Sequence, residues 1–197
     1  MAKTYTNLTV ANATAGNAIL ASDFSSVFTT LNNHNVPPLV RARRAGSQTI
    51  ATGALAAVNF DTRDIDTGAT ESPADALFTA TANFITIKTA GVYLITATVS
   101  IDATSATGSR AVVLVHQPTF TGSGDSATVA TGTRIAGQYA TALSGSIQTT
   151  LSATTLYSCA ASDKIAVIAF QNSGGNMTIS PAAEQSTLSA VFVGKVS

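Results

Sequence analysis

The chain contains few charged residues. Ten are Lys or Arg and ten are Asp or Glu, so charged side chains make up 10% of the 197 residues and the formal net charge is zero. A typical soluble domain has about 25% charged residues, and a surface this poor in charge is unusual for a free monomer. A net charge of zero also gives no electrostatic attraction to nucleic acid or to acidic membranes. We therefore expect no nucleic acid among the partners.

Cysteine and long apolar runs are also scarce. Cys159 is the single cysteine, which excludes an internal disulfide and leaves a buried thiol, the favoured reading, or a bridge to another chain. The longest dense apolar run, residues 165–170, is too short to span a bilayer. No apolar signal segment follows Lys3. We expect a protein that is made and folded in a cytoplasm, without membrane insertion.

Residues that carry catalytic chemistry are few. The two histidines, His34 and His116, lie in no recognisable catalytic motif. The sequence has no Cys/His cluster for zinc and no G-x-x-x-x-G-K-S/T loop for phosphate. We therefore expect a protein that is not an enzyme and that needs no cofactor.

One acidic cluster is a weak metal candidate. Asp61, Asp64 and Asp66 precede Gly68, and three carboxylates in one loop suit a hard cation such as calcium. Their spacing does not match an EF-hand loop, and Arg63 lies among them. Capping of a polar loop is the favoured interpretation, and no metal is assigned.

Among the patterns that are present, residues 90–101 give the strongest. Tyr93, Ile95, Ala97, Val99 and Ile101 alternate with residues that become more polar along the run. This period of two predicts a strand with one face in a core. Gly91, just ahead of Tyr93, predicts a turn or a close approach of backbone.

Further runs of this kind predict an all-β protein. The candidate strands are residues 40–44, 56–61, 83–88, 90–101, 110–116, 147–157, 164–171 and 187–196. Clusters of Gly, Ser, Pro and Asp separate these strands. Apart from one short helix near the N-terminus, no helix is predicted, and this combination is typical of a β-sandwich.

Two of these segments, residues 165–170 and 188–193, are apolar on both faces. A sandwich strand buries only one face within its own chain, so the other face needs a cover. Another copy of the chain is the economical cover. The predicted oligomer-interface residues are Ile165, Val167, Ile168, Phe170, Val191, Phe192 and Val193.

The chain divides at Pro37 and Pro38 into an N-terminal segment, residues 1–38, and a β domain, residues 39–197. Residues 1–18 read as an extended arm. A short amphipathic α-helix follows, with the apolar stripe Leu20, Phe24, Val27, Phe28 and Leu31. A helix this short is marginal alone, so its stripe packs on its own β domain, on two other copies, or on a neighbouring protein as an anchor.

Several segments together resemble a known family. They are F-I-T-I-K-T-A-G-V-Y-L-I from Phe84, A-A-S-D-K-I-A-V from Ala160, and T-L-S-A-V-F-V-G from Thr187. They are similar to the trimeric jelly-roll head of complement globular domains and tumour necrosis factor. In detail they look most like the short versions in virion proteins of tailed bacteriophages, which have stretches like L-V-R-A-R-R from Leu39. The leader, residues 18–34, is similar to segments that precede phage fibre and tail domains.

The resemblance implies a jelly-roll β-sandwich behind an N-terminal arm and one helix. It further implies a homotrimeric structural protein of the virion, serving as a capsid decoration, a head fibre or a tail-associated knob. Its partners would be its own copies, other virion proteins such as capsid or tail proteins, and, for host attachment, a cell-surface glycan. The alternative is a free lectin-like module that binds carbohydrate or another ligand, although the sequence has no Trp and only four Tyr to form such a site.

Overall fold

The structure is a computed structural model of the chain, and it describes residues 37–67, 77, 83–102, 107–117, 129–142, 148–180 and 186–195. The predicted arm, His34 and the anchor-helix residues lie outside the described residues. These features remain predictions.

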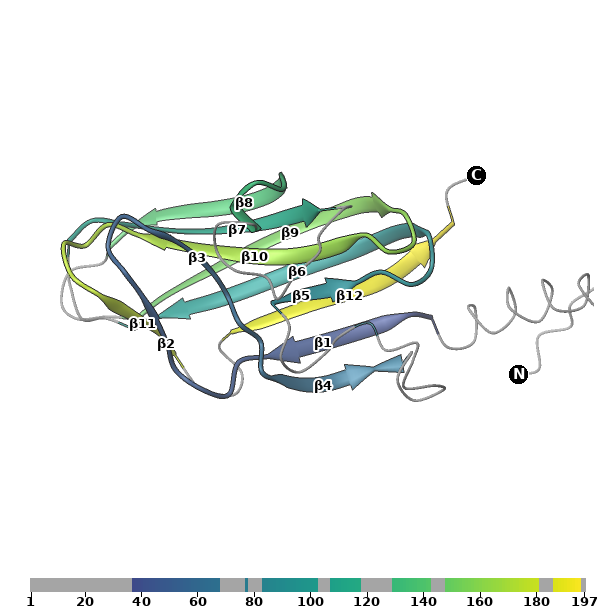
Figure 1. Cartoon of the computed structure of the whole chain (residues 1–197), viewed down its shortest axis with the longest axis horizontal. Helices are drawn as coiled ribbons and strands as arrows, with labels where there is room; N and C mark the ends of the chain where they lie inside the picture. Colours follow the sequence, from purple (N-terminus) through teal and green to yellow (C-terminus); the bar gives the residue numbers. More distant parts are fainter. Residues whose placement is uncertain are drawn as a thin grey trace, which may run out of the picture. The chain divides into compact units, whose positions relative to one another are not determined.

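In the described residues the chain forms twelve β-strands, arranged in two sheets (Figure 1). The seven-stranded sheet contains β1 (Leu39–Arg43), β2 (Gln48–Ile50), β4 (Thr62–Asp66), β6 (Gly91–Ile101), β9 (Thr149–Cys159), β11 (Met177–Ile179) and β12 (Thr187–Gly194). The five-stranded sheet contains β3 (Leu55–Ala57), β5 (Phe84–Thr86), β7 (Ser109–Gln117), β8 (Thr133–Thr141) and β10 (Lys164–Gln171).

The strand order is that of an antiparallel sandwich. In the larger sheet the long strands run in the order β4, β1, β12, β6, β9, and the short pair β11 and β2 continues from the end of β6. In the smaller sheet β8, β7 and β10 are neighbours, and β3 and β5 share the other edge of β10. The prediction of an all-β jelly-roll sandwich is confirmed.

The core lies between the two sheets, and β6 supplies its centre. Tyr93, Ile95, Ala97, Val99 and Ile101 all have exposed fractions of 0%. These are the residues that the alternation in the sequence assigned to the buried face. The strand predicted at residues 90–101 is therefore confirmed in position and in orientation.

Gly91 and Tyr93 show why the glycine stands where it does. The Tyr93 ring meets the Phe192 ring edge-on at a centroid distance of 5.4 Å, and its hydroxyl donates to the Thr89 carbonyl at 2.7 Å. A Cβ atom on Gly91 would lie 2.3 Å from the Phe192 ring and 2.6 Å from the Gly194 carbonyl oxygen. The glycine is thus required by the close approach of β12.

Four strands were not predicted from the sequence: β2, β4, β8 and β11. The longest of them, β8, is an edge strand whose residues are all exposed or half-buried. An edge strand with little burial on either face carries no alternation of apolar and polar residues, and Gly137 in its middle lowers its strand propensity further. Pairing with β7 forms this strand despite its weak sequence pattern.

Candidate functional site

The outer face of the seven-stranded sheet, which points away from the core, carries an unusual arrangement of side chains. The strand register places four apolar residues in one row across β1, β12, β6 and β9: Leu39, Val191, Leu94 and Leu156. Leu94 is 40% exposed and Leu156 is 62% exposed. We call these four residues the apolar row. Val193, at the end of β12, is a further exposed apolar residue, at 59%.

Beyond the apolar row the same face changes to hydroxyl groups. Three pairs hydrogen-bond across β6 and β9: Thr96 with Thr154 at 3.2 Å, Thr98 with Ser152 at 3.0 Å, and Ser100 with Thr150 at 2.7 Å. We call these six residues the hydroxyl ladder. Because each hydroxyl already has a partner, covering the ladder costs less than burying free hydroxyl groups. The face is thus apolar at one end and polar but uncharged along β6 and β9.

Charge on this face is confined to its β1–β4 edge. Asp64 Oδ1 lies 2.6 Å from Arg43 Nε, and Asp64 Oδ2 lies 3.8 Å from Arg41 Nε. Two guanidinium groups therefore share one carboxylate, and the edge keeps one excess positive charge. These arginines do not protect an edge strand, because β1 is paired on both sides.

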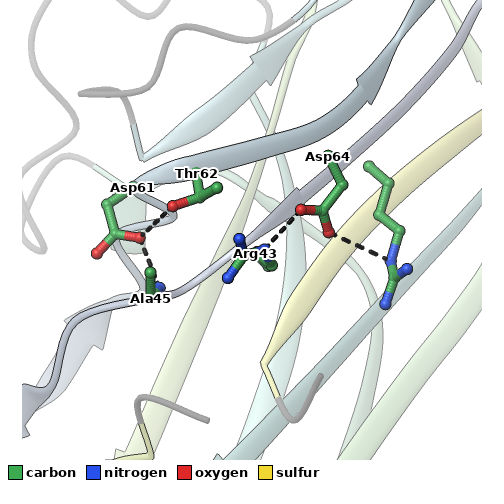
Figure 2. Close-up of polar contacts among 6 residues, drawn as sticks. Arg43, Ala45, Asp61, Thr62 and Asp64 are labelled. Carbon is green, nitrogen blue, oxygen red and sulfur yellow. Dashed lines mark hydrogen bonds and ion pairs between the residues drawn. The ribbon is translucent and has the colours of Figure 1, made fainter. Parts of the chain in front are cut away.

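The three carboxylates considered for calcium take separate partners, and Figure 2 shows those of Asp61 and Asp64. Asp61 accepts hydrogen bonds from the backbone N–H groups of Ala45 at 2.6 Å and Gly46 at 2.9 Å. Asp64 turns instead to Arg43, as Figure 2 shows. Asp66 is buried and accepts from the Leu77 N–H at 3.0 Å. The three weak metal candidates therefore do not converge on one point where a metal ion could bind.

Asp61 acts as a loop cap and is held ionised by its surroundings. Partial burial raises the pKa of Asp61, but the backbone N–H groups of Ala45 and Gly46, with the charge of Arg44 and the hydroxyl of Thr62, outweigh burial and bring the pKa below its ordinary value. Arg44 itself is buried, and burial lowers its pKa. Its guanidinium donates to the backbone carbonyls of Asn59 and, at 2.6 Å, Ser47.

The predicted interface residues of β10 lie elsewhere than expected. Ile165 and Val167 have exposed fractions of 0% in the main core, so a second copy cannot reach them and the prediction is wrong for both. Ile168, 2% exposed, belongs to a second apolar cluster on the outer face of the five-stranded sheet. Phe170 is half-buried on that same face. The second apolar face of β10 is therefore covered in large part by its own chain.

The predicted residues of β12 divide between the two faces. Phe192 packs on Tyr93 and against the main core, so it is not available to another copy. Val191 and Val193 remain on the surface, as the interface prediction requires. Leu94 and Leu156 were not predicted, although the sequence places Leu94 on the outward face of its strand. Their exposure depends on pairing between strands that are far apart in sequence.

His116 takes part in a contact that no sequence motif indicates. Its Nε2 lies 2.8 Å from Asp163 Oδ2, and its Nδ1 lies 3.2 Å from the Tyr157 hydroxyl. Asp163 also accepts from the Ala160 N–H at 2.8 Å, so it closes the turn between β9 and β10. The neighbouring thiol of Cys159 is buried, and burial, followed by the charge of Asp163, raises its pKa to about 12. A thiol of this kind is a poor nucleophile, so the cluster joins strands and has no activated nucleophile beside it.

Two further features are absent from the described part of the chain. No three of its His, Cys, Asp and Glu residues are grouped so that they could hold a metal ion. None of its helices has the length and apolarity that a membrane crossing requires.

No family model and no curated protein sequence matches the chain. Solved structures do match its fold. A tumour necrosis factor called Eiger from S. frugiperda has a TM-score of 0.58 at 14% identity, over 81% of this chain and 94% of that one. Murine APRIL at pH 5.0 has a TM-score of 0.56 at 11% identity, over 79% and 98% of the two chains. The globular domain of zebrafish complement 1qA protein has a TM-score of 0.50 at 13% identity, over 81% and 99%. At these identities the comparisons establish the fold, a jelly roll of the tumour necrosis factor and complement type.

Proposed function

We propose that this chain is a non-catalytic structural protein whose jelly-roll domain forms a homotrimer through the outer face of the seven-stranded sheet. The observation that carries the proposal is the pairing of Leu94 with Leu156 on that face, in a row of four apolar residues beside a ladder of paired hydroxyls. An apolar patch of this kind, without charge at its centre, is typical of interfaces rather than of free surface.

The size of the face supports a stable association. The strands β4, β1, β12, β6 and β9 contain 40 residues in all, and each residue covers about 3.3 Å along its strand and about 4.8 Å across to the next strand. The product is on the order of 600 Å², which is close to the roughly 800 Å² that each partner buries in a standard interface. The low charge of the whole chain, 10%, also suits a protein that spends its time against other subunits. The resemblance of its sequence segments to trimeric jelly-roll heads selects three copies over two.

We further propose that the trimer belongs to the virion of a tailed bacteriophage, as a capsid decoration, head fibre or tail-associated knob. The support is the resemblance of residues 18–34 and of the segment from Leu39 to phage proteins. In this role residues 1–38 attach the protein to the particle, and the jelly-roll domain projects outward. Function consists of binding and of stabilising neighbours, with no turnover.

The test of self-association is light scattering on the full chain and on a shortened form that begins at Pro37. This start keeps the Pro38 carbonyl, which accepts from the Phe192 N–H at 2.9 Å. We expect both forms to have a mass near three times 19.9 kDa, less the missing residues for the second. A shortened form that is a stable monomer would show that the N-terminal segment drives assembly and would overturn the role of the sheet face.

The test of attachment uses the double substitution Phe24→Ser and Phe28→Ser in the intact protein. We expect it to leave the trimer mass unchanged and to abolish incorporation into purified particles. Normal incorporation of this variant would overturn the role of the predicted helix as an anchor.

A further inference from the structure

The outer face of the five-stranded sheet carries a second apolar surface. The alternation of β10 and β7 turns Ile165, Val167, Val112 and Leu114 into the core, so their neighbours in sequence point outward. The register then gives three rows of outward residues: Leu55, Phe170, Ala111 and Tyr139; Ala57, Ile168, Val113 and Gly137; Ala166, Val115 and Arg134.

This surface is hollow in its middle. Ala111 and Gly137 have little or no side chain, whereas Leu55, Phe170 and Arg134 around them are larger. The result is a groove of about 240 Å³, lined by Leu55, Ala111, Val113, Arg134, Ile168 and Phe170. We call it the sheet groove. Leu55 is 38% exposed beside it, and Tyr139, at the end of the first row, is 64% exposed.

One lining residue of the sheet groove, Ile168, is already fixed by packing. Ala57, Val115, Ala166 and Ile168 form a buried cluster with Val129, each at most 5% exposed. A surface that is preformed in this way loses little conformational entropy when a partner binds. The groove is therefore suited to receive an apolar group without rearrangement.

The rim of the groove carries one charge, that of Arg134. Arg134 forms no ion pair with any described residue, and none of the six lining residues is acidic. A guanidinium beside an apolar surface is a strong site for a carboxylate, because it donates two parallel hydrogen bonds. Arg134 lies opposite Val115 on the neighbouring strand. Val115 is two residues along β7 from Val113, so these two valines are separated by about 7 Å along the strand. This separation equals that of residues i and i+2 in an extended chain.

We propose that the sheet groove binds an extended segment of a partner protein, with an apolar side chain over Val113 and a carboxylate two residues away on Arg134. The volume accommodates one or two side chains and is below the range of about 300–1,000 Å³ that small-molecule sites occupy. A sugar would require several hydrogen-bonding side chains, and the lining supplies only Arg134. Exposed Tyr and Arg around an apolar centre match the composition of protein-binding hot spots.

The inference does not depend on the proposed function. The groove and the self-association face belong to different sheets, so the groove stays open when three copies associate. In an assembled particle it would offer each copy one docking site for a further protein.

The test uses the full chain and three fluorescein-labelled peptides that have a Leu-Thr-Asp, Ser-Thr-Asp or Leu-Thr-Lys centre flanked by Gly and Ser. Binding is followed by fluorescence anisotropy, and the methyl signals of Val113 and Ile168 are followed by NMR. We expect the Leu-Thr-Asp peptide to bind about tenfold more tightly than either of the others, to shift both methyl signals, and to bind more weakly in about 1 M salt. Absence of binding up to millimolar peptide, or equal binding of all three, would overturn the proposal.

The variant Arg134→Glu tests the charge. Arg134 is exposed and forms no ion pair with any described residue, so the fold should be unaffected. We expect Arg134→Glu to bind the Leu-Thr-Lys peptide about tenfold more tightly than the Leu-Thr-Asp peptide, the reverse of the original chain. The control Lys88→Glu changes an exposed charge elsewhere and should leave the original preference unchanged. Unaltered preference in Arg134→Glu would overturn the proposal. A change in the light-scattering mass of Arg134→Glu would also overturn the proposal, because it would identify the occupant as a second copy. Binding of anionic lipid vesicles by the original chain that Arg134→Glu abolishes would overturn it too, because it would identify the occupant as a membrane.

Discussion

Leu94 and Leu156 face each other across β6 and β9, and both side chains point to solvent, with exposed fractions of 40% and 62%. A leucine pair in this position contributes little to the stability of one copy. It contributes much if another copy covers it, because complete burial of a leucine is worth about 2 kcal/mol.

The double substitution Leu94→Ser and Leu156→Ser should therefore separate assembly from folding. We expect association to weaken by about a thousandfold, with the light-scattering mass falling toward 19.9 kDa and the far-UV circular dichroism unchanged. Leu55→Ser is the matched control, since Leu55 is 38% exposed on the other sheet. A three-chain mass in the double variant would contradict the assigned interface.

A substitution at Gly91 should act on folding directly. In Gly91→Ala the new methyl group would meet the Phe192 ring at 2.3 Å and the Gly194 carbonyl at 2.6 Å, and overpacking of this kind costs about 1–3 kcal/mol. We expect chemical denaturation to show that loss in the free energy of unfolding. Gly175→Ala is the control, because a Cβ there meets nothing within 4 Å; equal effects of the two substitutions would argue against the close approach.

The fold was predictable from the sequence because its central strands bury one face. From Gly91 to Val99 of β6, buried residues alternate with half-buried or exposed ones, so the pattern gives both the strand and its orientation. The edge strand β8 lacked such a pattern because most of its residues are exposed, and only its pairing with β7 defines it.

The proposed self-association face was predictable only in part. Alternation shows that Val191 and Val193 share one face of β12, but it cannot show which strand lies next to them. Leu94 and Leu156 join them through pairings across 62 residues between β6 and β9 and about 97 between β6 and β12, which no local pattern specifies. The apolar second face of β10 was assigned to another copy because the sequence does not reveal that Ile168 packs in a buried cluster with Ala57, Val115 and Val129 of its own chain.

The pH dependence of stability should include a contribution from Asp61. Its pKa is lower in the folded chain than in the unfolded chain, so its stabilisation is present above the unfolded pKa of about 3.9 and is lost as the pH falls through the folded value. Asp61→Ala removes the acceptor of two backbone N–H groups, and we expect a loss of about 2 kcal/mol at neutral pH. Denaturation from pH 7 down to pH 3 measures both effects.

Asp61→Asn serves as the matched variant for this test. It keeps one acceptor oxygen and removes the charge, so its loss at neutral pH should be smaller than that of Asp61→Ala. The difference between either variant and the original chain should shrink below about pH 4. A difference that is constant over the whole pH range would show that ionised Asp61 is not the stabilising form.

The thiol of Cys159 should report on unfolding rather than react in the folded protein. Burial, followed by the charge of Asp163, raises its pKa from 9.0 to about 12, which lowers the thiolate fraction about a thousandfold, and the residue is 3% exposed. With an aromatic disulfide reagent at pH 8 we expect no labelling of the folded chain within minutes and one thiol per chain in denaturant, with Cys159→Ala as the blank. Because reaction requires both opening of the β9 end and loss of the proton, the labelling rate should rise with denaturant along with the loss of structure. Rapid labelling without denaturant would mean that the end of β9 is open. It would contradict the conclusion that the Cys159 thiol is buried and unreactive in the folded chain.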